Sequence, residues 1–377
     1  LYRKAKVEPA YRFYLLYDKI CREDILCHAY ALARANAGAP GVDGVTFAQI
    51  DWLGREAWLA GLREELVLKR YRPDPVRRVS IPKPNGGERP LGIPTIRDRV
   101  VQTAAKIVLE PIFEADFEDN AYGYRPVRGA VDAVKEVRRL ICRGYTDVVD
   151  ADLSRYFDSI PHAELLKSVA RRIVDRHVLR LIKLWLKAPI EERDDGDGTR
   201  RMSGGKSNTR GTPQGGVASP LLANIYMNRF LKYWRLTGRG EAFCAHVIAY
   251  ADDFVILSWG CAAEALAWMK EVMKRLGLEV IGGMHVLEHG RPAGAAGACP
   301  AASGPDAVDG RFRPGDSHRR ITGGRGGGRG GCFCGGWGVG GGAPLPGARP
   351  GRETSRRRAP RGDHPGQRDR PRAAARL

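Results

Sequence analysis

The sequence has no long hydrophobic run. None of its apolar stretches approaches the roughly 20 residues that a membrane-spanning helix needs. Charged residues occur throughout the first 30 positions, so the apolar core of a signal peptide is also missing. The eight cysteines include no CxxC pair, which argues against a disulfide framework or a cysteine-ligated zinc site. These absences predict a cytoplasmic protein with reduced thiols and no membrane partner.

A second deficit is confined to the C-terminal part of the chain. Residues 283–377 contain no Lys, Asn or Tyr and are dominated by Gly, Arg, Ala and Pro. Such a segment buries too little apolar surface to offset the entropy cost of ordering it, so we expect disorder. One interpretation is a Gly/Arg-rich RNA-binding tail. We favour a frameshift product, because codons for Gly, Arg, Ala and Pro can begin with two G/C bases, and those for Lys, Asn and Tyr begin with two A/T bases.

Positive charge is what the chain has in excess. The formal net charge is +19 and the isoelectric point is about 9.8, which predicts a polyanionic partner. Nucleic acid is the first candidate, and an anionic membrane surface is the second. Basic residues are dense in LKRYRPDPVRRV at 68–79, which fits a track for an RNA template. Tyr71 in this run has the surroundings of a base-stacking residue, although a helix end with solvated charges explains it equally well.

Two adjacent aspartates, Asp252 and Asp253, lie between two apolar runs in HVIAYADDFVILSW at 246–259. The runs predict two short buried strands, with AlaAspAsp as the turn of a hairpin. A single Asp in a turn is usually explained by capping of backbone groups. Two neighbouring carboxylates repel each other, however, and a nearby cation would offset that cost. A metal site is therefore about as well supported as ordinary turn chemistry.

A third carboxylate comes from TDVVDADLSRYFDSIPHAELLKSVARRI at 146–173, which predicts a strand, a short turn and a helix starting near Pro161. Asp152 ends the strand, and the next residue, Leu153, can offer a backbone carbonyl to the same cation. Asp150 points to the same side at strand period, so spacing alone does not choose between the two aspartates. Capping of the turn accounts for Asp158.

Pairing of this strand with the hairpin would bring Asp152 and Asp252 within reach of two divalent ions about 3.5 to 4 Å apart. Magnesium suits hard carboxylate oxygens and keeps water and substrate phosphates as its remaining ligands. The chemistry expected of such a site is phosphoryl transfer.

Several motifs together resemble the reverse transcriptase of bacterial group II introns. They are YADD at 250–253, DADLSRYF at 150–157 and RGTPQGGVASPLLANIYMNRF at 210–230. Two further blocks, at 81–114 and 121–134, resemble those that precede these motifs in that family. The resemblance implies an RNA-directed DNA polymerase, a nucleotidyltransferase, with a role in intron splicing and mobility.

The fold implied by the resemblance is α+β, with the fingers and palm of a right-hand polymerase and an antiparallel sheet packed on helices. The implied division is an N-terminal helical segment at 1–35, fingers at 36–145, a palm at 146–282 and the tail at 283–377. After CAAEALAWMKEVMKRLGLEV the family pattern stops. We therefore expect the thumb and the maturase region to be missing, and the chain to be poorly soluble and weakly active or inactive.

The resemblance also assigns the catalytic residues. Asp152, Asp252 and Asp253 would be the carboxylates that hold two Mg²⁺ ions, with the Leu153 carbonyl as a further ligand. Phe157, five residues after Asp152, would pack under the sugar of the incoming nucleotide. A bulky ring there clashes with a 2′ hydroxyl and so selects deoxynucleotides. Without the resemblance, Phe157 would be assigned to the core.

Nucleotide-binding residues are expected on a hairpin and in a loop. The run IPKPNGGERPLGIP at 81–94 predicts two short strands joined by a turn, flanked by Lys83 and Arg89. In the family these two cations contact the incoming nucleotide, and Lys and Arg suit a triphosphate as a point charge and a bidentate fork. Gln214 would contact the nascent pair or the primer-template backbone.

Three residues are expected at the template or primer. Gly215 would allow close approach by a base pair, because it has no side chain. Arg125 in GlyTyrArgPro would lie near template or nucleotide, and Tyr250 of YADD would lie at the primer-template.

The implied partners are an RNA template, namely intron RNA, a DNA or RNA primer, and deoxynucleoside triphosphates, with homodimerisation left open. Within the enzyme class, the alternatives are a retron or diversity-generating reverse transcriptase and an RNA-dependent RNA polymerase. The long GTPQGGVASPLLANIY block favours the intron type, and Phe157 argues against the RNA polymerase. Outside that class, the alternatives are an RNA-binding splicing cofactor and a fragment without catalysis.

Overall fold

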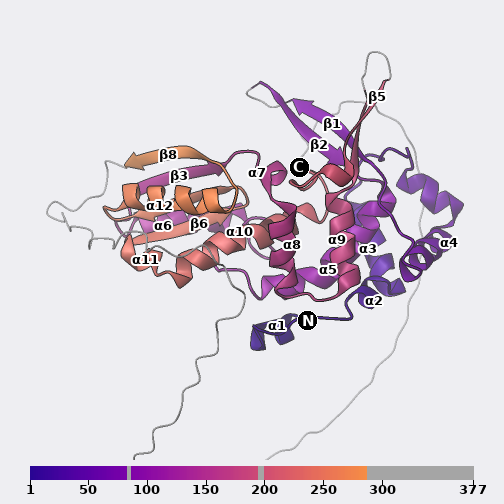
Figure 1. Cartoon of the computed structure of the whole chain (residues 1–377), viewed down its shortest axis with the longest axis horizontal. Helices are drawn as coiled ribbons and strands as arrows, with labels where there is room; N and C mark the ends of the chain where they lie inside the picture. The colour runs from indigo at the N-terminus through magenta and orange to yellow at the C-terminus, as the bar shows by residue number, and fades with distance from the viewer. Residues whose placement is uncertain (83–85, 194–198, 287–377) are drawn as a thin grey trace, which may run out of the picture. The chain divides into compact units, whose positions relative to one another are not determined.

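The computed structural model describes residues 1–82, 86–193 and 199–286. These residues form two four-stranded sheets and a set of helices, so the expected α+β class is confirmed (Figure 1). All of them belong to one compact unit, and the predicted division into fingers and palm stays a prediction. In the part of the chain that is described, every helix is too short or too polar to cross a bilayer.

The first sheet, called here the hairpin sheet, has the strand order β2-β1-β4-β5. Strand β1 pairs antiparallel with β2 and parallel with β4, and β4 pairs antiparallel with β5. The hairpin predicted at 81–94 is thereby confirmed, and Gly86 and Gly87 in its turn have φ of 80° and 84°, which favour glycine. The strands are β1 Val76–Pro82, β2 Glu88–Ile93, β4 Pro189–Arg193 and β5 Arg200–Gly204.

The second sheet, called here the carboxylate sheet, has the order β6-β7-β3-β8 and is antiparallel throughout. Alternation along β3 buries Val149 and Ala151 in the main core and turns Asp150 and Asp152 to the other face. The hairpin predicted at 246–257 is confirmed, although Asp253 is already the first residue of a strand. The strands are β3 Asp147–Leu153, β6 Ala245–Tyr250, β7 Asp253–Ser258 and β8 Val280–Val286.

Two helices cover the carboxylate sheet. Helix α12, Ala262–Arg275, contacts β3, β7 and β8, and its buried residues belong to the same core cluster as Val149. Helix α6, Ala130–Ile141, contacts β6 and β7 through a separate cluster that includes Leu140 and Leu257. Because neighbouring strand residues point to opposite faces, α6 packs on the face that also carries Asp152.

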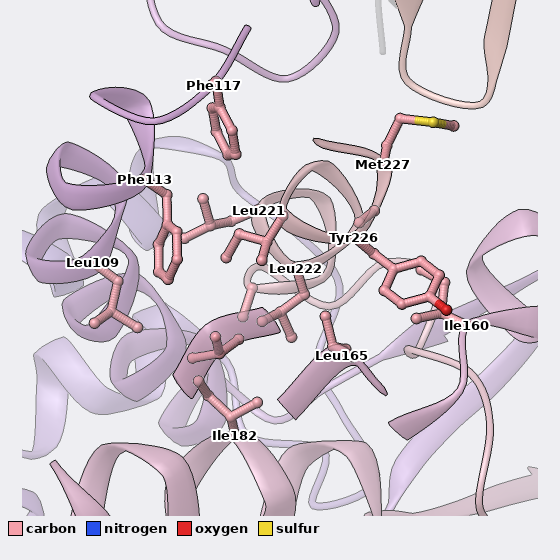
Figure 2. Packing of buried hydrophobic residues seen from close by; sticks show 14 of the residues in the cluster. Leu109, Phe113, Phe117, Ile160, Leu165, Ile182, Leu221, Leu222, Tyr226 and Met227 are labelled. Carbon is pink, nitrogen blue, oxygen red and sulfur yellow. The ribbon is translucent and has the colours of Figure 1, made fainter. Parts of the chain in front are cut away.

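The main core lies among helices that join the two sheets. Helix α5 is buried on most of its surface, which explains its apolar and small residues on all sides. Figure 2 shows where side chains of α5, α8, α9 and α10 meet: Leu109, Phe113, Leu165, Ile182, Leu221 and Leu222. These helices are α5 Ile96–Glu114, α8 His162–Ala170, α9 Arg176–Leu186 and α10 Ser219–Leu236.

The N-terminal residues are helical, as expected for 1–35, and α3 packs on α5. Helix α4 begins with a capping box in which the Thr46 side chain accepts from the Gln49 amide. The remaining helices are α1 Tyr2–Val7, α2 Tyr17–Ile20, α3 Glu23–Ala35, α4 Phe47–Val67, α7 Tyr156–Ser159, the 3₁₀ turn Gly205–Ser207 and α11 Arg239–Ala242. Strand β8 runs past the predicted break at Gly282, and the rest of the predicted tail lies outside the described residues.

Candidate active site

The carboxylate sheet brings the predicted aspartates together. In the register of β3 and β7, Asp152 lies directly opposite Asp253. Direct cross-strand partners share one face of a sheet, so the two carboxylates are neighbours. Asp252 is the second residue of the two-residue turn that joins β6 to β7, and Asp253 follows it as the first residue of β7. Asp152 and the adjacent pair Asp252 and Asp253, which are remote from it in sequence, therefore lie at one end of the sheet.

The electrostatics of Asp253 reflect this crowding. Burial raises the pKa of its carboxyl above the usual 3.8, and the charges of Asp252, Asp152 and Asp150 raise it further. Like charges facing each other across strands destabilise a sheet, and a divalent cation would offset that repulsion.

The donor chemistry at this end of the sheet fits a hard cation, because every side-chain donor is a carboxylate oxygen. Within the described ranges no three His, Cys, Asp or Glu side chains are arranged as a group that could hold a metal ion. Carboxylates that bind Mg²⁺ together with substrate need not form such a group, since water and substrate phosphates complete the coordination. The residues present therefore fit divalent ions that are bound together with substrate.

The turn beside Asp252 is held against a second segment. Ala251 has a φ of 60°, which is uncommon for a residue with a side chain. Gly123 lies so close that a Cβ there would clash with the backbone nitrogen of Ala251. The Asn224 amide of α10 donates to the Gly123 carbonyl at 2.8 Å, and the Tyr122 amide donates to the Ala249 carbonyl of β6 at 2.8 Å. Only glycine fits at 123, and the turn is supported from outside the sheet.

Tyr124 is a residue of the site that the sequence analysis missed. Its side chain is 45% exposed, and its ring meets the Phe157 ring edge to face at 6.2 Å between centroids. Burial and the charge of Asp252 raise the pKa of its hydroxyl, whereas Arg89 on β2 acts in the opposite direction. Tyr124 thus responds to charges on both the turn that carries Asp252 and the hairpin sheet. In the sequence, GlyTyrArgPro indicates a role only for its arginine.

The stretch of chain that carries this candidate site also matches a known protein family. Residues 81–280 match the family model described as reverse transcriptase (RNA-dependent DNA polymerase). That range is more than half of the chain and contains all three aspartates. The chain belongs to the reverse transcriptase family. Members of this family use divalent metal ions and bind an RNA template.

Curated relatives confirm the resemblance to group II intron proteins. Protein YkfC of Escherichia coli (strain K12) is 35% identical over 304 residues, which cover 71% of this chain and 76% of YkfC. The group II intron-encoded protein LtrA of Lactococcus lactis subsp. cremoris is 36% identical over 222 residues, which cover 59% of this chain. The matched part spans only 35% of LtrA.

A solved structure that is similar to this reverse transcriptase is a partial Cas6-RT-Cas1–Cas2 complex. The TM-score is 0.39 at 22% identity, and the match covers 69% of this chain and 42% of that one. This TM-score is too low to support an argument about the site.

Arg125 of the reverse transcriptase is not placed as expected. Its guanidinium is buried, with the side chain only 3% exposed, and forms an ion pair with Glu114 at 2.5 Å. It also donates to the carbonyls of Glu118 and Ala121 at 2.7 and 2.8 Å. The guanidinium holds the loop before Gly123 and is not available to a template or nucleotide, whereas the predicted position of Arg125 near one of them stays a prediction.

Gly215 in the TPQGG loop allows close approach by another part of the chain. Gly215 has a φ of 96°, and a Cβ there would clash with the carbonyl oxygen of Gly92 in β2. The Gly92 amide donates to the Gln214 carbonyl at 2.6 Å. The missing side chain thus admits the hairpin sheet, and approach by a base pair is not needed to explain it. A contact between base pair and Gly215 stays a prediction.

Gln214 and Phe157 lie around the short helix α7. The Gln214 side-chain amide donates to the Asp158 carboxylate at 3.4 Å. The Asp158 side chain does not cap the start of α7, contrary to expectation. Phe157 is 6% exposed and packs against Tyr124 and Tyr156. The Phe157 carbonyl accepts from the Thr212 amide at 2.6 Å, which ties α7 to the TPQGG loop. Their nucleotide contacts stay predictions.

Four further site residues are placed as follows. Arg89 is exposed on β2 opposite Ile81, and Lys83 lies outside the described residues. Tyr250 is the last residue of β6 and is 39% exposed. The Leu153 side chain is buried in the core, and its carbonyl as a metal ligand stays a prediction.

Tyr71 does not stack on a base. Its ring is buried, its hydroxyl donates to Asp98 at 2.6 Å, and the Trp185 indole donates to that hydroxyl at 3.1 Å. Burial raises the pKa of Asp98 to about 6. The base-stacking interpretation is wrong, because Tyr71 belongs to an internal hydrogen-bond network.

Proposed function

We propose that this reverse transcriptase is the RNA-directed DNA polymerase of a group II intron, which extends a primer 3′ end on an RNA template with deoxynucleotides. The observation that carries the proposal is the register of β3 and β7, which pairs Asp152 with Asp253 beside Asp252 in the turn. A role in intron splicing and mobility belongs to the same proposal, and it is supported by the similarity to LtrA.

The carboxylates of Asp152, Asp252 and Asp253, with the Leu153 carbonyl, would hold two Mg²⁺ ions. When bound, such ions activate an attacking hydroxyl and neutralise the departing pyrophosphate. The chain itself fixes the carboxylates: sheet register sets the separation of Asp152 and Asp253, and the Gly123 contact fixes the turn that carries Asp252. Preorganised charge of this kind costs no rearrangement during the reaction.

The nucleotide would bind between the aspartates and the hairpin sheet. Arg89 is exposed on β2, and its charge opposes the rise in the pKa of the Tyr124 hydroxyl, which supports a role for Arg89 in contacting a triphosphate next to Asp252. Tyr124 and Phe157 would form the floor under the sugar. Lys83 would add a second cation, and Gln214 would contact the nascent base pair.

In this proposal the carboxylate sheet belongs to the palm, at 146–282, and strands β1 and β2 of the hairpin sheet belong to the fingers, at 36–145. Strands β4 and β5 of the hairpin sheet come from the palm range of the chain. Intron RNA as template, a DNA or RNA primer, deoxynucleoside triphosphates, a cytoplasmic location and an optional homodimer are parts of the same proposal. Gly215 and Tyr250 would face the primer-template.

Primer extension on an RNA template with Mg²⁺ tests the proposal. Any extension by the unaltered chain would support the proposal, and Asp252→Ala should abolish that extension. An RNA-binding splicing cofactor would keep its RNA affinity and biological effect in the Asp252→Ala variant. The same assay decides whether the chain is weakly active or inactive, as expected from the sequence, because robust extension by the purified chain would contradict that expectation.

A further inference from the structure

A groove of about 590 Å³ lies between helices α8 and α9, outside the site described above. Its floor is apolar and includes Leu166 and Leu179 together with two alanines. Its remaining lining residues are four cations: Lys167, Arg176, Arg180 and Lys183. The three on α9 lie on one face of that helix, because they follow the spacing i, i+4 and i+7.

The cations on α9 have little compensation from carboxylates. Within the described part of the chain, no salt bridge involves Arg176, Arg180 or Lys183, whereas Lys167 pairs with Glu164 at 2.7 Å. Asp175, at the start of α9, is used by backbone amides of its own helix and of residues 16–17. The groove therefore carries net positive charge that faces solvent.

Positive charge continues at the ends of the groove. The Arg12 guanidinium donates to the carbonyl of Ala170, a lining residue, at 3.0 Å. Lys69 lies beside α9, where its carbonyl is within 3.5 Å of the Arg180 guanidinium. The pKa of His177 is lowered by burial first and then by the charges of Lys69 and Arg176. A cationic track thus runs along α8 and α9.

We propose that this groove binds the phosphate backbone of a nucleic-acid strand at a place distinct from the polymerase site. The cations on α9 extend over about 10 Å of helix, which suits successive phosphates and not a single compact anion. The apolar floor suits the sugar edges of such a strand. The proposal does not depend on catalysis, because no groove residue belongs to the carboxylate site.

The salt dependence of RNA binding tests the proposal in the full chain. The variant Arg176→Gln, Arg180→Gln, Lys183→Gln is compared with the control Arg22→Gln, Arg55→Gln, Arg275→Gln, which removes the same charge from exposed arginines that are ion-paired. The measurement is the affinity for a labelled single-stranded RNA over a range of salt concentrations. The slope of log K against log salt is negative, and each lost phosphate contact makes it less steep by about 0.7. The slope of the groove variant should therefore be less steep by about 2.

An equal change of slope in the two triple variants would overturn the proposal. A footprint on the unaltered protein guards against misfolding of a variant: RNA should protect Lys167 and Lys183 from acetylation. Unprotected lysines would contradict the proposal, as would protection by an acidic peptide but not by RNA, which would indicate a protein partner. The polymerase proposal is tested separately, since Asp252→Ala should keep the full salt slope.

Discussion

The two sheets of this reverse transcriptase are built in opposite ways. The carboxylate sheet is antiparallel, has an apolar face in the main core and is covered by α12 and α6. The hairpin sheet is largely exposed: β5 is exposed along its whole length, and the distal half of β1 is exposed as well. A buried sheet holds charges at fixed separation, whereas an exposed hairpin leaves its cations free to adjust to a ligand. The two sheets therefore differ in how firmly they hold their charged side chains.

The largest expected effect comes from the carboxylate sheet. Asp152→Asn should lower primer extension by about 10³-fold or more, because metal-bound charge stabilisation is worth several kcal/mol. The same variant should be more stable in EDTA by about 0.2 to 1 kcal/mol, since it removes a like charge opposite Asp253. It should also lower the pKa of Asp253 toward 3.8. Primer extension, urea unfolding in EDTA and a pH titration of Asp253 measure the three effects.

Asp150→Asn is the matched control, because Asp150 lies on the same strand and the same face as Asp152. It should keep extension close to that of the unaltered chain. If Asp150→Asn were inactive and Asp152→Asn active, the choice of Asp152 as the metal ligand would be wrong.

An intermediate effect is expected from the support of the catalytic turn. Arg125→Met should destabilise the protein by about 3 to 5 kcal/mol, because it leaves the partly buried Glu114 without its partner. The control Arg128→Met breaks a pair with the exposed Asp119 and should cost about 0 to 1 kcal/mol. Chemical denaturation measures both. If Arg125→Met left stability unchanged and weakened template binding, that result would support the position of Arg125 near the template that the sequence predicted.

The smallest effect is expected on the hairpin sheet. Arg89→Ala should raise the KM for deoxynucleoside triphosphates about tenfold, because one charged hydrogen bond is worth about 1.5 to 3 kcal/mol. Stability should hardly change, since Arg89 is exposed. Arg201→Ala on β5, also exposed, should leave KM unaltered. A fall in kcat without a rise in KM for Arg89→Ala would argue against a nucleotide clamp in the hairpin sheet.

The sequence was most informative where a local pattern carries its own meaning. The apolar runs on either side of the two aspartates predicted β6 and β7, and Pro161 marked the start of α8. The choice of Asp152 over Asp150 came from family resemblance, because strand period places both on one face. Boundaries shifted by a residue or two, as when Asp253 joined the strand: the backbone pairing of a hairpin continues up to a tight turn.

Sequence reasoning failed where a residue's partner is distant in the chain. Arg125 is a residue of the type that binds a nucleic-acid backbone. Only the folded chain places the Glu114 carboxylate and the carbonyls of Glu118 and Ala121 around its guanidinium. The missing side chain of Gly215 suggested room for a base pair, but in the fold the Gly92 carbonyl occupies that space. Tyr124 escaped notice because a lone tyrosine has no motif of its own.

The sequence by itself determined the strand and helix periods, the excess of positive charge and the identity of the acidic residues, because these depend on neighbours in the chain. Only the tertiary structure decided that Asp152 faces Asp253, that Arg125 is internal and that the α9 cations form a track with Arg12. These facts depend on register and packing between segments remote in sequence, and no local spacing specifies them.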